Sequence, residues 1–147
     1  MKHVREILKS KAIKETFTVQ PTTKVLEALR LMSEKGVGAM LVVENKRLVG
    51  IVTERDYARK VILMARSSHT ATVSEIMTSD IFTVDPDQTI DECMELLTDK
   101  RVRHLPVIDE GRLIGLISIG DVVKNIISEQ ENTIQHLEQY IRGETVL

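Results

Sequence analysis

Two junctions in this chain place a hydroxyl three residues before a carboxylate. They read Thr53-Glu54-Arg55-Asp56 and Ser118-Ile119-Gly120-Asp121. At the start of a helix the hydroxyl can accept a backbone hydrogen bond and the acid can reach back, as in a capping box. The same groups suit a ligand, because a helix N-terminus attracts a phosphate and a carboxylate accepts hydrogen bonds from ribose hydroxyls. Helix capping and nucleotide binding both stay open at this point.

The sequence contains no complete motif for a catalytic nucleophile, a dinucleotide fingerprint or a zinc site. A nucleophile elbow needs glycine two residues before its serine, and Leu116 stands two residues before Ser118. Ser118 and Thr53 occupy the same position in the two junctions. A hydroxyl that occurs twice favours a repeated ligand role over a unique catalyst. The stretch Gly36-Val37-Gly38 follows a predicted helix, and Leu41 replaces the third glycine of a dinucleotide fingerprint. The histidines lack zinc-ligand spacing, so we expect neither an enzyme nor a metal site.

Composition narrows the possible partners. The 147 residues fit one domain, and a net charge of −2 with a pI of about 6.1 lacks the basic footprint of a nucleic-acid binder. The apolar runs are too short to span a membrane, and the first residues lack the apolar stretch of a signal peptide. Cys93 is the single cysteine, predicted to be a small core residue on a helix. We expect a cytoplasmic protein without nucleic-acid or membrane partners.

Both junctions belong to an internal repeat. A shift of 65 positions lays Phe17-Thr18-Val19 over Phe82-Thr83-Val84, and residues 47–50 over residues 112–115. A shorter similarity precedes each copy, at residues 4–10 and 73–79. Two tandem copies of one unit imply pseudo-twofold packing, with related sites between the copies.

Each copy predicts the element order β-α-β-β-α. The strands are expected at residues 17–19, 39–43 and 48–52, and again at 82–84, 105–108 and 113–117. The helices are expected from residue 25 to the glycines at 36 and 38, from about 54 to 65, from 90 to 98, and after 118. Thr22 or Thr23 is expected to cap the first of these helices.

The doubled unit resembles a pair of CBS domains, also called a Bateman module. The resemblance rests on residues 83–87, on residues 103–109 and on both Gly-x-x-[Ser/Thr]-x-x-Asp junctions, and it covers about residues 4–128. It implies an α/β (α+β) fold with repeats at 4–66 and 73–128 and a C-terminal helical extension at 129–147. It also implies a regulatory module that binds AMP, ADP, ATP or NAD in clefts between the repeats and signals to a partner protein.

The resemblance also implies ligand-binding residues, position by position. Asp56 and Asp121 match the ribose-binding acids, with Thr53 and Ser118 beside them at ribose or phosphate. In the family, the acid of one repeat faces the strand that follows the first helix of the other repeat. Asp121 would then share a cleft with Val37, Gly38, Ala39 and Met40, and Asp56 would share one with Val102, Arg103, His104 and Leu105. The entrance of the first strand, near Lys14 and Thr16 or Ser79 and Ile81, would flank the adenine.

The two implied clefts differ in polarity. The first copy has Gly38-Ala39 where the second has Arg103-His104, and Leu41 where the second has Pro106. A guanidinium fork matches phosphate oxygens, so Arg103 and Arg55 are candidates for phosphate recognition. Equal occupancy of the two clefts is therefore not expected.

The end of the chain departs from the repeat. Helical spacing continues from residue 121 to 142, with Ile134, Leu137 and Ile141 on one face. CBS pairs usually dimerise through helices of both repeats, so the resemblance favours a homodimer, and we expect the tail to extend its surface. Two alternatives to nucleotide sensing stay open: a structural dimerisation module with vestigial sites and, less favoured, a small enzyme acting on an adenosyl compound.

Overall fold

The computed structural model describes residues 2–11 and 15–143, which divide into two compact units. Unit 1 combines the chain up to residue 14 with residues 84–147, and unit 2 is residues 15–83. The fold is mixed, with about 47% helix and 24% strand. Within the described residues, no helix is both long enough and apolar enough to cross a membrane.

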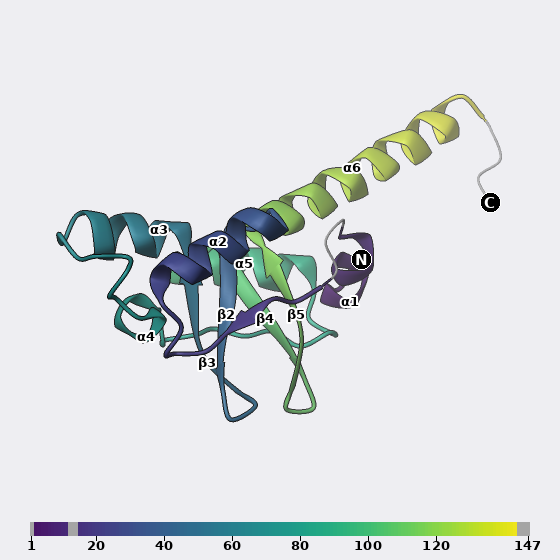
Figure 1. Cartoon of the computed structure of the whole chain (residues 1–147). Coiled ribbons are helices and arrows are strands. Elements are labelled where there is room, and N and C mark those ends of the chain that lie inside the picture. The colour runs from purple at the N-terminus through teal and green to yellow at the C-terminus, as the bar shows by residue number, and fades with distance from the viewer. Residues whose placement is uncertain (1, 12–14, 144–147) are drawn as a thin grey trace. The chain divides into compact units, whose positions relative to one another are not determined.

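Unit 2 is a three-stranded sheet with helices packed on it (Figure 1). Its elements are β1 (Thr18–Val19), α2 (Val25–Lys35), β2 (Ala39–Glu44), β3 (Arg47–Thr53), α3 (Glu54–Tyr57), a π-helical turn (Ala58–Ile62) and α4 (Val73–Ile76). β1 pairs in parallel with β2, and β2 pairs antiparallel with β3. The hairpin turns at Asn45 and Lys46, both with positive φ, as a type I′ turn requires.

The apolar spacing of α2 explains its packing. Val25, Ala28 and Met32 recur on one face and are buried in the core of unit 2, together with Met40 and Val42 of β2. The helix ends at Gly36, whose φ of +67° provides the left-handed C-cap. The predicted helix and hairpin of the first copy are therefore confirmed.

Unit 1 repeats the helix and the hairpin. Its elements are α1 (Val4–Ser10), α5 (Ile90–Lys100), β4 (His104–Asp109), β5 (Arg112–Ser118) and α6 (Ile119–Ile141). Glu110 and Gly111 form the same turn with positive φ. Cys93 is fully buried on α5, and burial raises the pKa of its thiol to about 11, as expected for a core residue rather than a nucleophile.

The strand predicted at residues 82–84 is wrong. Only Val84 makes an isolated bridge, to Val107 of β4. In unit 2, the amide of Leu41 donates to the carbonyl of Phe17 (3.2 Å) and extends the pairing of β1. Pro106 takes the place of Leu41 in the second copy, and proline has no N–H to donate to the corresponding bond.

One smaller expectation for unit 2, a threonine cap on α2, is also wrong, and another, the helix over 54–65, is confirmed only in part. The residue before α2 is Lys24, without a side-chain cap, while the hydroxyl of Thr23 accepts from the amide of Gln20 (3.1 Å). The helix predicted over 54–65 is α-helical only to Tyr57, after which the backbone widens into the π-helical turn. There the amide of residue 63 donates to the carbonyl of Ala58 (3.3 Å). This hydrogen bond joins residues five positions apart, as in a π-helix.

The short helices α1 and α4 make equivalent bonds in different units. In unit 2, the amide of Val73 donates to the carbonyl of Thr23 (2.8 Å). In unit 1, the amide of Val4 donates to the carbonyl of Gln88 (2.8 Å). Each short helix therefore packs on the copy that it does not directly precede along the chain.

Candidate functional site

Each hydroxyl–acid junction is a complete capping box. In unit 2, the amide of Asp56 donates to Oγ1 of Thr53 (3.0 Å), and the amide of Thr53 donates to Oδ2 of Asp56 (3.0 Å). In unit 1, the same two bonds join Asp121 and Ser118, at 3.1 and 2.8 Å. The capping interpretation is confirmed at both junctions, and it holds each carboxylate at a fixed place beside the end of a strand.

Each junction also lies beside the start of the preceding hairpin strand. The amide of Glu54 donates to the carbonyl of Gly38 (3.1 Å), and the amide of Ile119 donates to the carbonyl of Arg103 (2.9 Å). The ladder then pairs Ala39 with Thr53, and His104 with Ser118. The structure thus brings the predicted residues of one repeat together. Since the first and third amides of each helix are already paired, a phosphate would meet fewer amides than a bare N-terminus offers.

The other predicted site residues differ in exposure. Ala39 and Met40 are buried, so a ligand could meet their backbone but not their side chains. Arg55, Arg103 and Gly38 are exposed, and five residues are half-buried: Val37, Val102, His104, Thr16 and Ile81. Lys14 lies outside the described residues. The pairings of Asp121 with residues 37–40 and of Asp56 with residues 102–105 join different units, and they stay predictions.

A lysine that the sequence analysis missed contacts the acid of unit 2. Nζ of Lys60 lies 3.3 Å from Oδ1 of Asp56 and donates to the carbonyl of Ile76 (2.9 Å). The hydroxyl of Thr78 also reaches Oδ1 of Asp56, at 3.5 Å. Both oxygens of this carboxylate therefore have partners within unit 2. The spacing of four residues between Asp56 and Lys60 was a signal that could have found the pair.

A different lysine contacts the acid of unit 1. Nζ of Lys11 lies 3.1 Å from Oδ2 of Asp121 and also donates to the carbonyl of Leu116. Lys11 follows α1 directly, 110 positions before Asp121, and no sequence spacing could have indicated the contact. Among the described residues, Oδ1 of Asp121 has no hydrogen-bond or ion-pair partner.

The two cation positions differ because the repeat is not exact. The counterpart of Lys60 in the second copy is Asn125, which is buried. Its amide donates to the carbonyl of Asp121 (2.8 Å) and to the hydroxyl of Ser10 (3.3 Å). An asparagine cannot supply a charge, so unit 1 takes its ammonium from the end of α1. The carboxylate of Asp121 is consequently the more accessible acceptor of the two.

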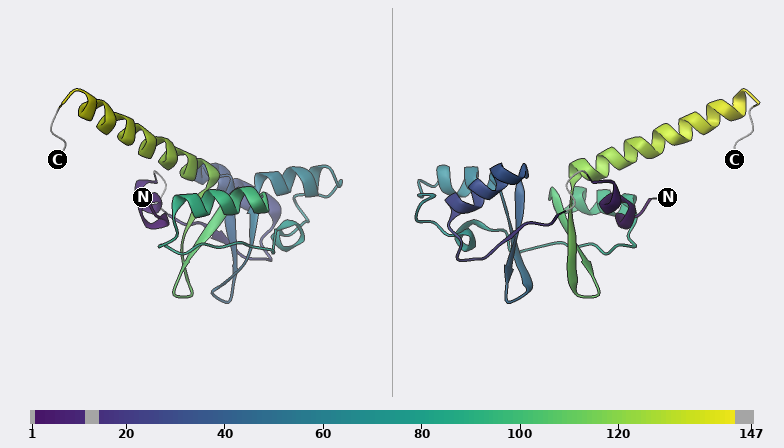
Figure 2. Two further views of the ribbon diagram at one scale, coloured as in Figure 1. Left: turned by 180° about the vertical axis from the view of Figure 1, so that it is seen from behind. Right: turned by 45° about the vertical axis from the view of Figure 1, so that its right-hand side comes forward.

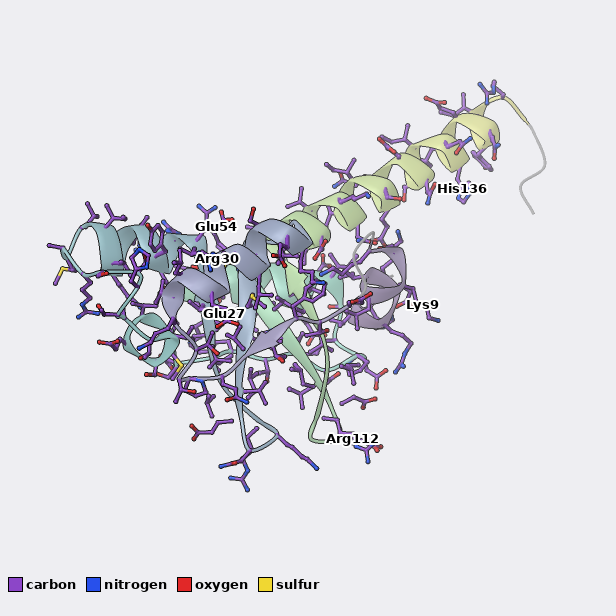
Figure 3. The ribbon with its side chains drawn as sticks, viewed as in Figure 1. Lys9, Glu27, Arg30, Glu54, Arg112 and His136 are labelled. Atoms are coloured by element: carbon purple, nitrogen blue, oxygen red, sulfur yellow. The ribbon has the colours of Figure 1, made fainter. Side chains whose placement is uncertain are left out.

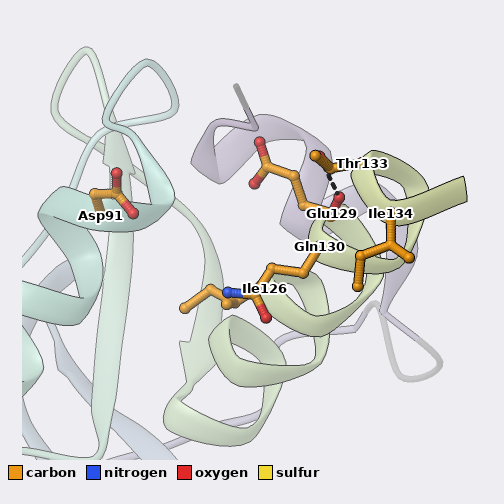
Figure 4. Close-up of a pocket in the computed structure, with 6 residues that line it drawn as sticks. All are labelled: Asp91, Ile126, Glu129, Gln130, Thr133 and Ile134. Carbon is orange, nitrogen blue, oxygen red and sulfur yellow. Dashed lines mark hydrogen bonds between the residues drawn. The ribbon is translucent and has the colours of Figure 1, made fainter. Parts of the chain in front are cut away.

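An open groove of about 440 Å³ in unit 1 lies apart from these junctions (Figure 4). It separates the start of α5 from the middle of α6, and its lining comprises Asp91, Ile126, Glu129, Gln130, Thr133 and Ile134. None of the predicted ligand-binding residues lines it.

Comparison with known proteins agrees with the repeat. The family model of the CBS domain matches residues 4–63 and 73–128. The chain belongs to the CBS-domain family. The predicted family and the predicted mixed fold, with two repeats and a C-terminal helix, are confirmed.

Three similar proteins put this membership in context. The mitochondrial CBS domain-containing protein CBSX3 of Arabidopsis thaliana is 44% identical over 81% of this chain, which spans only 60% of that protein. A solved CBS-domain protein from Burkholderia ambifaria is 53% identical, with a TM-score of 0.84, over 88% of this chain and 96% of that one. The CBS domain pair of protein MJ0100 was solved with 5′-methylthioadenosine and S-adenosyl-L-methionine. It shares the fold at 23% identity and a TM-score of 0.75, over 88% of this chain and 98% of that one.

Proposed function

We propose that this protein is a regulatory module that binds an adenosine-containing nucleotide (AMP, ADP, ATP or NAD) and signals its presence to a partner protein. The observation that carries the proposal is the pair of capped junctions, each of which fixes a carboxylate beside a strand end with an ammonium 3.1 to 3.3 Å away. A carboxylate in this position can accept hydrogen bonds from ribose hydroxyls, and the neighbouring ammonium can pair with a phosphate of the same nucleotide. Membership of the CBS family supports this ligand class, since the MJ0100 pair binds two adenosine derivatives.

In this proposal the acids accept hydrogen bonds from the ribose and the cations meet the phosphate. Asp121 is the stronger acceptor, because its Oδ1 has no partner among the described residues, whereas both oxygens of Asp56 are engaged. A ribose at Asp56 must displace Lys60 or Thr78. We therefore assign the tighter site to Asp121 and the weaker one to Asp56.

The ligand can be tested by calorimetry against AMP, ADP, ATP and NAD, with guanosine nucleotides as the base-specificity control. We expect micromolar dissociation constants, about −7 to −9 kcal/mol, for at least one adenosine nucleotide. Native mass spectrometry of freshly purified protein would weigh a retained ligand directly. If none of the four nucleotides gives a heat of binding at millimolar concentration, a structural dimerisation module would be the better description.

The proposal also includes assembly and signalling. We assign the protein to a homodimer in the cytoplasm, with a separate effector protein whose binding depends on the nucleotide. Affinity capture with and without the bound nucleotide would test the effector, and cell fractionation would test the location. If the same proteins are captured with and without the nucleotide, the signalling role is contradicted, but the proposal of nucleotide binding is not.

A further inference from the structure

The last helix has two different faces. On one face Val122 and Asn125 are buried, where the start of α6 packs on α1 and α5 of unit 1. Beyond that contact α6 extends away from the rest of unit 1 (Figures 1 and 2), and His136 lies on this projecting part (Figure 3). A second face carries large aliphatic side chains that are 38% to 81% exposed, namely Val123, Ile127, Ile134, Leu137 and Ile141.

These exposed side chains follow a heptad pattern. With Gln130 they occupy positions 123, 127, 130, 134, 137 and 141, at alternating steps of four and three residues. A mean spacing of 3.5 residues keeps one stripe facing a second helix, which is the signature of a coiled coil. We call these six positions the α6 seam. Since the seam lies on a different face from Val122 and Asn125, packing within unit 1 leaves its apolar side chains at least 38% exposed.

We propose that the α6 seam pairs with the same seam of a second copy of this chain, as a parallel two-stranded coiled coil. The residue types favour this partner. The a positions are all isoleucine, at 127, 134 and 141, and the d positions are Val123, Gln130 and Leu137. Isoleucine at a with leucine at d, as at Leu137, favours parallel two-stranded coiled coils.

The polar layer at Gln130 favours the parallel orientation. There the g positions Ile126 and Thr133 meet the partner's Glu131 and the partner's Glu138, so that no like charges face each other. The antiparallel register that retains all six layers sets Glu131 against the partner's Glu131 and Lys124 against the partner's Glu138, so its like-charge and opposite-charge contacts offset each other. It also buries each Gln130 against an isoleucine, where its amide lacks a side-chain partner. The parallel dimer avoids this cost, because its two Gln130 side chains face each other.

The groove beside α6 borders part of the seam. Gln130 and Ile134 belong both to the α6 seam and to the lining of the groove. Asp91, at the start of α5, lines the opposite side of the groove (Figure 4). A helix laid along the seam would therefore border the groove and cover Ile134. This pairing depends on α6 and not on nucleotide binding, although it specifies how the proposed homodimer is joined.

The first test compares two substitutions that add the same charge to the full chain. Leu137→Asp places two carboxylates in one d layer, whereas Asn132→Asp lies at an f position on the outer side. We expect the dimer dissociation constant from sedimentation equilibrium to rise about tenfold or more for Leu137→Asp and to stay within about twofold for Asn132→Asp. Far-ultraviolet circular dichroism checks that both variants fold. Equal association of the two variants, or a wild-type chain that is monomeric at about 100 μM, would overturn the proposal.

The second test fixes the orientation. In the parallel dimer two Leu137 positions face each other, so Leu137→Cys should form a disulfide-linked dimer under mild oxidation. In the antiparallel register these positions lie ten residues apart along the axis, about 15 Å, which is too far for a disulfide. Cys93 is buried and should leave the wild type without a cross-link. Cross-linking only in a mixture of Ile127→Cys and Leu137→Cys would contradict the parallel arrangement, and no cross-link in any sample would contradict the pairing itself.

Discussion

Replacing Asp121 by asparagine separates helix capping from ligand binding. The substitution preserves the size of the side chain and one acceptor oxygen, and it removes the charge. In unit 1 that charge has two partners, the amide of Ser118 at 2.8 Å and Nζ of Lys11 at 3.1 Å. The side chains of Lys11 and Asp121 are only 18% and 24% exposed, so the ion pair is partly shielded from water.

The expected loss of stability follows from these two contacts. Asparagine can still accept from the amide of Ser118, so capping accounts for less than about 1 kcal/mol. Exposed ion pairs contribute about 0.2–1 kcal/mol and breaking a buried pair costs about 3–5 kcal/mol, and this pair lies between them. We expect Asp121→Asn to lower the free energy of unfolding by about 2 kcal/mol. If the acid accepts from ribose hydroxyls, nucleotide binding should weaken by about 1.5–3 kcal/mol, or about 10- to 150-fold.

Urea unfolding and calorimetry on the same samples measure both quantities. Asp91→Asn is the matched control, because Asp91 is an exposed acid in the first turn of α5 in the same unit. In a double-mutant cycle with Lys11→Met, the two changes should couple by about 1 kcal/mol. Loss of stability with wild-type nucleotide affinity would refute the ribose role and leave capping as sufficient. A loss below about 0.5 kcal/mol would refute the importance of the ion pair.

Three further predictions concern packing, pH and the tail. Gly50→Ala should cost about 1–3 kcal/mol and Gly115→Ala less, as measured by urea unfolding. A Cβ at position 50 would lie 2.6 Å from the sulfur of Met77 and 3.2 Å from a backbone oxygen, whereas one at position 115 meets the movable end of a leucine side chain at 2.7 Å. Burial raises the pKa of the Cys93 thiol from 9.0 to about 11, so the folded protein keeps a proton that the unfolded chain releases. Stability should therefore fall between pH 9 and about 11 by at most about 2.7 kcal/mol, and a Cys93→Ala variant that loses as much over that range would contradict this cause. Deleting residues 129–147 should weaken the dimer in sedimentation while nucleotide affinity stays within a few fold, and an unchanged dimer would assign the tail to another role.

Local features of this protein could be predicted from the sequence. The capping boxes at Thr53 and Ser118 depend on residues within one helical turn, so the pattern itself specifies them. The hairpins and the buried face of α2 follow from short apolar runs, helical spacing and turn residues in the same way. The family was predicted because the doubled unit, with its motifs at 83–87 and 103–109 and its two junctions, resembles a pair of CBS domains. The site residues assigned through that resemblance stay predictions.

Contacts between distant segments were decided only by the tertiary structure. The missing strand at 82–84 depends on Pro106, which lacks the amide that a parallel neighbour needs. The ammonium beside Asp121 comes from Lys11, because Asn125 occupies the place of the lysine that serves the other acid. Neither outcome has a local signature, since each results from the packing of a segment on a strand or helix more than 20 positions away. The sequence therefore determined the two acids and their caps, and the folded chain determined which cation each acid meets.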